Sequence, residues 1–315
     1  MKTGVLLTTL VLLVASAAIG LGAGERWIDP LSPATALDST ILWELRWPRV
    51  QTAAAVGALL ATAGVCLQVL LGNPLAEPYV LGISGSSTIG ALLALFLFPD
   101  VGLASAIGAF LGAMVGLSLI LPFSVLGPHR LLLAGVVFSA LWGAMVSLAM
   151  TLLPENELGR AISWMLGNLA SETAPPSVLL FGVVVLVAAA WFLAPGMDRL
   201  LLGEHHAEML GVEIPRLRWS LLLVASFATA ISVAAAGTIG FVGLVVPHIA
   251  RQFVGPLHRV LVPVSAAGGA TLLLFADAGS RALMSPAELP VGVVTAMIGV
   301  PLFLWLLIRR TTWNS

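Results

Sequence analysis

The sequence predicts an all-α, polytopic membrane protein with ten transmembrane helices. Of its 315 residues, 59% are hydrophobic and only 9% are charged, and its mean hydropathy is +1.06. A soluble protein of this composition would lack enough polar residues to cover its surface. The chain contains ten long apolar segments, nine without any charged residue. Most approach the roughly 20 residues that a helix needs to cross the hydrocarbon core.

The nine uncharged segments are predicted to be membrane helices. In chain order they cover residues 4–21, 50–71, 80–98, 101–123, 131–153, 178–194, 219–236, 260–276 and 291–308. The first follows Lys2 and ends in small residues, as a secretory signal peptide does, but its apolar run exceeds the 7–15 residues typical of such a signal. We therefore expect it to be the first membrane helix. Cys66, the single cysteine, is expected to pack inside the second.

The tenth segment, residues 239–253, differs from the other nine. It is the shortest, it carries His248 and Arg251, and Gly240, Gly243 and Pro247 are expected to interrupt it. A broken, polar helix is tolerated in a bilayer only where neighbouring protein or a water-filled cavity satisfies its backbone. This segment therefore predicts a pathway through the protein.

Positive charges predict that both termini are cytoplasmic. An alternating ten-helix topology with the N-terminus inside places nine Lys and Arg residues inside and five outside. Those inside are Lys2, Arg130, Arg199, Arg216, Arg218, Arg251, Arg259, Arg309 and Arg310, and those outside are Arg26, Arg46, Arg49, Arg160 and Arg281. If residues 239–253 formed a re-entrant loop, six would lie inside and eight outside, which contradicts the rule.

Missing residue types exclude several activities. Lys2 is the only lysine and no GxxxxGK[ST] run exists, so the chain cannot bind ATP through a P-loop. The five histidines show no metal-ligand spacing. Glu77 and Asp277, the carboxylates closest to the apolar segments, both lie near segment ends, which disfavours a proton-driven carrier. We expect no enzymatic activity, no cofactor, no bound metal and no nucleic-acid partner.

Three polar stretches remain. Residues 43–49 combine Trp and Arg outside the second helix, as either an interfacial anchor or a docking surface. Residues 73–79 contain two prolines and predict an extended cytoplasmic turn. Residues 196–218 form the longest cytoplasmic loop, and within it residues 204–210 read as a short helix between Gly203 and Gly211. That helix could be solvated or could contact an energy-supplying protein.

Taken together and in this order, the motifs resemble the permease subunits of type II ABC importers, which carry iron-siderophores, haem and vitamin B12. The matching stretches are RWPR (46–49), GNPLAEPYVLGISG (72–85), RLLLAG (130–135), GEHHAEMLGV (203–212), GTIGFVGLVVPHIARQFVG (237–255), HRVLVP (258–263) and AELPVGVVTAMIGVPLFLWLL (287–307). The similarity runs from about residue 24 to the C-terminus.

The resemblance implies one transmembrane permease domain over residues 1–315. It implies a homodimer of ten-helix subunits with the pathway at the dimer interface, in the cytoplasmic or inner membrane of a bacterium or archaeon. Two ATPase subunits would bind on the cytoplasmic side and a substrate-binding protein on the outside. ATP hydrolysis would belong to the ATPase subunits.

The resemblance also assigns roles to residues. Arg46 and Arg281 match outer arginines that pair with glutamates of the binding protein. Asn73 and Leu75 match the cytoplasmic gate, whereas Pro128 and His129 stand where vitamin B12 permeases carry small hydroxyl residues. Residues 203–218 match the loop that couples to the ATPase, and its short helix with flanking positions comprises Gly203, Glu204, Glu208, Leu210 and Gly211.

Within the family, the sequence favours vitamin B12 as cargo, because residues 24–30 and 43–46 and the Ala76-Glu77-Pro78 form of the gate loop resemble B12 permeases. A ferric siderophore or haem is the alternative. Two other classes stay open: a self-powered secondary transporter, and a membrane anchor or signalling scaffold without transport. A neighbouring gene for a P-loop ATPase would separate the importer from both.

Overall fold

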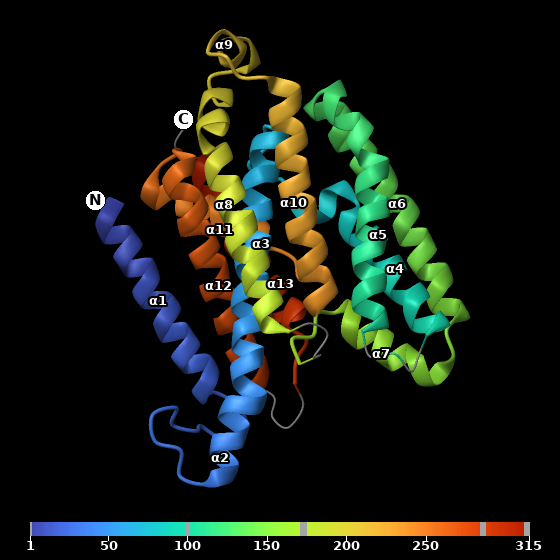
Figure 1. Cartoon of the computed structure of the whole chain (residues 1–315), viewed down its shortest axis with the longest axis vertical. Helices are drawn as coiled ribbons and strands as arrows, with labels where there is room; N and C mark the ends of the chain where they lie inside the picture. The colour runs from blue at the N-terminus through green and yellow to red at the C-terminus, as the bar shows by residue number, and fades with distance from the viewer. Residues whose placement is uncertain (1, 99–100, 102, 171–174, 284–287, 312–315) are drawn as a thin grey trace.

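The long helix α3 (Trp47–Leu70) lies near the centre of the protein and several other helices pack directly against it, whereas the helices between residues 83 and 152 pack on one another and on the helix at residues 214–236 (Figure 1). The computed structural model describes residues 2–98, 101, 103–170, 175–283 and 288–311, and these contain helices and no strand. In chain order the elements are α1 (Lys2–Gly22), α2 (Ala36–Thr40), the π-helical turn η1 (Ile41–Arg46), α3 (Trp47–Leu70), the 3-10 turn η2 (Pro78–Leu81), α4 (Ile83–Leu97), α5 (Ala104–Ile120), the 3-10 turn η3 (Leu121–Leu126), α6 (Pro128–Leu152), α7 (Glu155–Met165), α8 (Pro176–Leu200), α9 (Glu204–Met209), α10 (Ile214–Ala236), α11 (Val242–Val254), α12 (His258–Ala282) and α13 (Val291–Thr311).

Each of the ten predicted segments is largely helical. Within the part of the chain that the structure describes, six helices are long and apolar enough to cross a membrane: Ala36–Leu70, Ala104–Leu126, Pro128–Leu152, Pro176–Leu200, Ile214–Ala236 and His258–Ala282. The remaining four segments contain shorter apolar helices: Leu7–Gly22, Ile83–Leu97, Val242–Val254 and Val291–Trp305. The helices α5, α6 and α8 leave most of their apolar surface uncovered, as helices that face lipid do.

Small residues let the central helix approach its neighbours closely. The most apolar stretch of Ala36–Leu70 is 94% buried. A Cβ atom on Gly57 would lie 2.2 Å from the carbonyl oxygen of Gly269 on α12, and one on Gly64 would lie 1.9 Å from that of Gly243 on α11. Only glycine allows such backbone contact between helices.

The second predicted segment begins earlier than expected. Residues 43–49, which the sequence places outside the second helix, are helical and continuous with α2 and α3. Pro48 lies at the start of α3 and has no N–H for the carbonyl four residues before it. The wider π-helical turn immediately before Pro48 gives the ring room without ending the helix.

Candidate functional site

Two charged sites lie at opposite ends of α3. Arg49 lies near its start and Gln68 near its end. At 1.5 Å per residue these positions are about 28 Å apart, close to the thickness of the hydrocarbon core. We call the first site the arginine cluster (Arg46, Arg49, Asp277, Arg281 and Glu288) and the second the loop pocket (the cavity around Gln68, Pro128, Glu204, Arg218 and Arg251).

In the arginine cluster, Arg46 and Arg281 hold the C-terminal end of α1. Arg46 Nη1 donates to the carbonyls of Leu21 at 2.9 Å and Gly22 at 2.7 Å. Arg281 donates from Nη2 to Gly20 at 2.6 Å and from Nη1 to Ala23 at 2.5 Å. The last carbonyls of a helix lack partners within the helix and favour a positive charge. The two arginine side chains supply both the hydrogen-bond donors and the positive charge.

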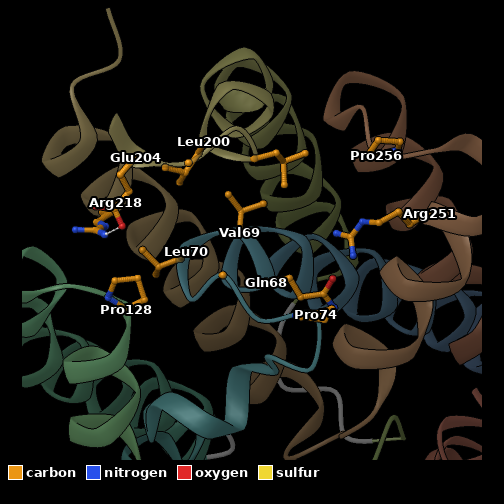
Figure 2. A pocket seen from close by; sticks show the side chains of 13 residues that line it. Gln68, Val69, Leu70, Pro74, Pro128, Leu200, Glu204, Arg218, Arg251 and Pro256 are labelled. Carbon is orange, nitrogen blue, oxygen red and sulfur yellow. Dashed lines mark hydrogen bonds and ion pairs between the residues drawn. The ribbon is translucent and has the colours of Figure 1, made fainter. Parts of the chain in front are cut away.

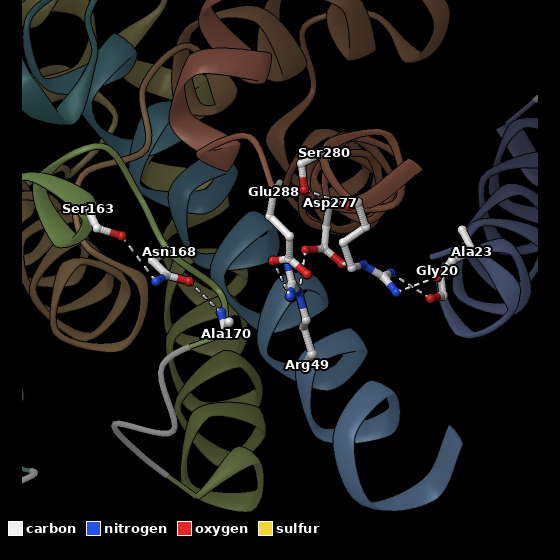
Figure 3. A network of polar contacts seen from close by, with 10 residues as sticks. Gly20, Ala23, Arg49, Ser163, Asn168, Ala170, Asp277, Ser280 and Glu288 are labelled. Atoms are coloured by element: carbon white, nitrogen blue, oxygen red, sulfur yellow. Dashed lines mark hydrogen bonds and ion pairs between the residues drawn. The ribbon is translucent and has the colours of Figure 1, made fainter. Parts of the chain in front are cut away.

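A buried carboxylate joins Arg49 to Arg281 (Figure 3). Asp277 on α12 has a fully buried side chain. Its Oδ1 accepts from Arg49 Nε at 2.8 Å, and its Oδ2 lies 2.9 Å from Arg281 Nη2. Arg49 Nη1 also donates to Glu288 Oε2 at 2.8 Å. The two guanidinium groups neutralise the Asp277 charge, as a buried ion requires.

The arginine cluster borders a cavity of about 290 Å³ that is open to the surface. Both predicted docking residues, Arg46 and Arg281, line it together with Arg49, Glu25 and Glu288. The structure thus brings the two predicted residues together and adds Arg49, whose role the sequence motif did not specify. Their docking role stays a prediction.

At the other end, the expected short helix in the loop between α8 and α10 is α9. It begins after Gly203, at φ +95°, and is followed by Gly211, at φ +79°. Both glycines take left-handed conformations that a side chain would strain. Glu208 and Leu210 are exposed at the tip of the loop, and Figure 1 shows α9 projecting beyond the rest of the protein.

A salt bridge fastens this loop to α10, and a hydrogen-bonded pair close to the loop joins α8 to α12. Arg218 Nη2 on α10 donates to Glu204 Oε1 on α9 at 2.5 Å. Asp198, near the end of α8, accepts from the backbone N–H of His258 at 2.8 Å, and its Oδ1 lies 2.7 Å from His258 Nδ1. Because His258 begins α12, Asp198 satisfies an unpaired donor at that helix N-terminus.

The loop pocket is a cavity of about 490 Å³ between α3, α8, α10 and α11 (Figure 2). It brings together Pro128, Gly203, Glu204 and Arg251 from the sequence-predicted sites with Arg218, the last residue of the predicted coupling loop, and it adds Gln68, which no motif identified. The other predicted gate residues are next to lining residues in the chain but do not line the pocket themselves. Asn73 Oδ1 accepts from the backbone of Leu75 at 2.9 Å in a tight turn, Leu75 is exposed, and His129 is exposed at the start of α6.

The interruption of the tenth segment lies earlier than expected. Residues 237–241 are non-helical and α11 is continuous through Gly243 and Pro247, so these two residues do not break the helix. Among the described residues, Phe241 is the one non-glycine with a positive φ, at +68°. The Glu77 carboxylate accepts from its N–H, and Thr238 Oγ1 donates to the carbonyl of Met165. Neighbouring protein therefore satisfies the break, as the bilayer requires.

A polar contact accompanies Pro247 inside α11. Proline lacks the N–H that would bind the carbonyl of Gly243. The amide Nε2 of Gln68 lies 3.4 Å from this oxygen and 3.4 Å from that of Leu244, and donates to both. His248 is buried one residue further on, and Arg251 reaches the loop pocket.

The position of Glu77 corrects the sequence interpretation. We expected residues 73–79 to form a cytoplasmic turn with Glu77 at its end. Instead, the carbonyl of Tyr79 accepts from Ser139 Oγ at 3.4 Å, and Ser139 lies about 17 Å along α6 from its first residue. The loop therefore descends to roughly the middle of the helix bundle. Glu77 binds the start of α11 there, so the chain does hold a carboxylate within the bundle.

Comparison with known proteins gives consistent matches. A model of the FecCD transport family matches residues 5–309. The vitamin B12 import system permease protein BtuC of Vibrio cholerae is 41% identical over 294 residues, covering 91% of this chain and 88% of its own. BtuC of Vibrio vulnificus is 40% identical over 312 residues, covering 96% and 93%.

The fold is also similar to that of a solved transporter. The structure of an inward-facing metal-chelate type ABC transporter superposes with a TM-score of 0.87 at 32% identity, covering 98% of this chain and all of that one. A second solved structure, PsaBC from Streptococcus pneumoniae in complex with Fab, has a TM-score of 0.56 at 17% identity and supports the fold alone.

Proposed function

Because the chain belongs to the FecCD transport family, we propose that it is the permease subunit of an ATP-driven ABC importer for vitamin B12. The observation that carries this proposal is the identity of 40–41%, over nearly the full length, to permeases named for vitamin B12 import. The chain is a multi-pass membrane protein, and on this proposal it translocates cargo while partner ATPases hydrolyse ATP.

We propose that all ten apolar segments cross the membrane with both termini in the cytoplasm. The shortest, α11, has 13 residues and is about 20 Å long, too short for a hydrocarbon core of about 30 Å. The five non-helical residues before it add at most about 16 Å. The distribution of Lys and Arg, nine inside against five outside, supports ten crossings over a re-entrant loop.

The partners follow from the two charged sites. Two copies of the chain would form the pathway between them. The exposed α9 would bind an ATPase subunit, since Glu204 at its start pairs with Arg218 on α10, and Asp198 on the preceding helix binds the start of α12. The arginine cluster would meet the binding protein, where charged pairs govern orientation and association rate more than affinity. Nucleotide binding would then rock the helices between outward-open and inward-open states.

Glu77 bears on the alternative of a self-powered carrier, because an ionisable group within a bundle can serve proton transfer. Its carboxylate, however, accepts from the backbone N–H of Phe241 at the start of α11, which gives it a structural role. We therefore retain the ABC importer. A ferric siderophore or haem is the alternative cargo, favoured by the 32% identity to the metal-chelate type transporter.

Transport in reconstituted vesicles tests the proposal. Proteoliposomes containing this chain, its ATPase and its binding protein should accumulate radiolabelled cyanocobalamin only when ATP is present. Uptake without the ATPase would indicate a secondary transporter. Uptake of haem or a ferric siderophore, with none of cyanocobalamin, would keep the importer and change the cargo.

A further inference from the structure

All three arginines of the arginine cluster already have acceptors inside the protein. Arg46 binds the α1 carbonyls, and Arg281 binds Asp277 and the α1 carbonyls. Arg49 binds Asp277 and Glu288. A carboxylate from outside must therefore either add to these contacts or replace one of them.

The acceptors differ in how easily they can be displaced. Asp277 is fully buried between two guanidinium groups, and withdrawing either would weaken the compensation of a buried charge. The carbonyls of Leu21 and Gly22 belong to the end of a helix and need their donors. Glu288, by contrast, has 48% of its side chain exposed and precedes α13 in a non-helical stretch. Two contacts of the cluster lie at the surface, the Arg49–Glu288 pair and the bond from Arg46 Nη2 to the Arg26 carbonyl at 3.3 Å. Only the first gives a guanidinium group a carboxylate that another carboxylate can replace.

We propose that Glu288 is an intramolecular competitor for docking: it occupies Arg49 in the free permease and is displaced by a carboxylate of the incoming partner. Counting Asp277 behind the cavity, three guanidinium groups are balanced by three carboxylates, so an incoming carboxylate is best accommodated by exchange for one that is already there. This inference rests on the proposed function, in which that partner is the binding protein. Exchange of one carboxylate for another keeps Arg49 paired throughout.

A matched pair of substitutions separates competition from general electrostatics. Glu25 and Glu288 both line the cavity, and Glu25 is exposed. Glu25→Gln and Glu288→Gln remove the same charge from the same cavity, but only the second frees an Arg49 donor. An exposed ion pair contributes up to about 1 kcal/mol. Competition therefore predicts that Glu288→Gln tightens docking by about two- to fivefold more than Glu25→Gln does.

A double-mutant cycle assigns the effect to Arg49. The dissociation constant of the cyanocobalamin-loaded binding protein is measured on permease–ATPase complexes in nanodiscs. In an Arg49→Gln background, Glu288→Gln should no longer tighten docking, because the shared partner is gone. Arg49→Gln leaves Asp277 paired with Arg281. If it nevertheless does not fold, Arg49→Met, which keeps a long side chain without a donor for Glu288, serves as the background.

Each outcome decides the inference. The inference is supported if Glu288→Gln tightens docking of the binding protein more than Glu25→Gln does, and if this difference disappears in the Arg49→Gln background. Equal effects of the two glutamate variants, or an effect that persists without Arg49, overturn it while leaving the importer intact if the wild type still takes up cyanocobalamin. A wild type that neither binds the loaded protein nor transports overturns both.

Discussion

Replacing Gly64 by alanine tests the packing between α3 and α11. The new Cβ atom would lie 1.9 Å from the carbonyl oxygen of Gly243 and 2.7 Å from its Cα. Ordinary contacts of a Cβ atom begin at 3.4 Å. The two backbones would have to separate by about 1.5 Å, because carbon and oxygen cannot approach more closely without strong repulsion.

The cost can be worked out from the contacts that separation would change. Overpacking a well-packed interior costs about 1–3 kcal/mol. The amide of Gln68 already lies 3.4 Å from the carbonyls of Gly243 and Leu244, so a further 1.5 Å would break both bonds and cost about 1 kcal/mol more. Alanine in a helix gains about 0.5–1 kcal/mol over glycine. The net expectation is a loss of about 1–3 kcal/mol in the free energy of unfolding.

Cys66 provides the assay, because this single cysteine is fully buried two residues from the substitution. A thiol-reactive fluorophore should label it only when the bundle opens, so labelling against temperature reports unfolding. Gly64→Ala should label at a lower temperature than the wild type. Gly143→Ala is the control, because a Cβ atom at this position in α6 would meet no atom of a neighbouring segment within 4 Å. Its Cys66 should label at no lower temperature than in the wild type. Identical curves for all three proteins would refute the packing argument.

Three further predictions concern other contacts. Glu77→Ala should lower the thermal midpoint more than Glu77→Gln does, because glutamine can still accept a hydrogen bond from the Phe241 N–H. Alanine leaves that buried donor unsatisfied, which costs about 1–3 kcal/mol. Equal midpoints for the two variants would contradict the contact. Asp198→Ala should destabilise the protein by a similar amount, since His258 loses two partners, and Asp198→Asn should recover part of the loss. Ala207→Pro should break α9, in which Ala207 is buried, and leave ATP hydrolysis running without uptake; retained uptake would exclude α9 from coupling.

Periodicity and residue type predicted much of the helical architecture. The apolar segments could be predicted as helices because long apolar runs with few or no charges are typical of membrane-spanning helices. Gly203 and Gly211 marked the ends of α9, since each takes a left-handed conformation that glycine tolerates best. The amphipathic helix α7 was missed, although Ala161 and Trp164 are buried three residues apart on one of its faces.

Contacts between distant segments could not be predicted. Gln68 and Gly243 are 175 residues apart, and no local pattern in one indicates the other. The loop around Glu77 contains two prolines and polar residues, the usual composition of a surface turn, so its descent into the bundle depends on partners such as Ser139 and Phe241. In the same way, Arg46 and Arg281 identified a charged face, but the α1 carbonyls that they bind carry no sequence signal.

The π-helical turn before Pro48 fixes the angular phase between α2 and α3. Such a turn inserts one residue relative to an α-helix, which rotates everything before it by about 100° around the helix axis. Asp38 in α2, which pairs with Arg26, faces that partner because of this rotation. A chain one residue shorter here would keep its hydropathy and every charge, yet Asp38 would face another side of the continuous helix formed by α2, η1 and α3. The shape of this end of the protein is thus set by a count of residues and not by the chemistry of any one of them.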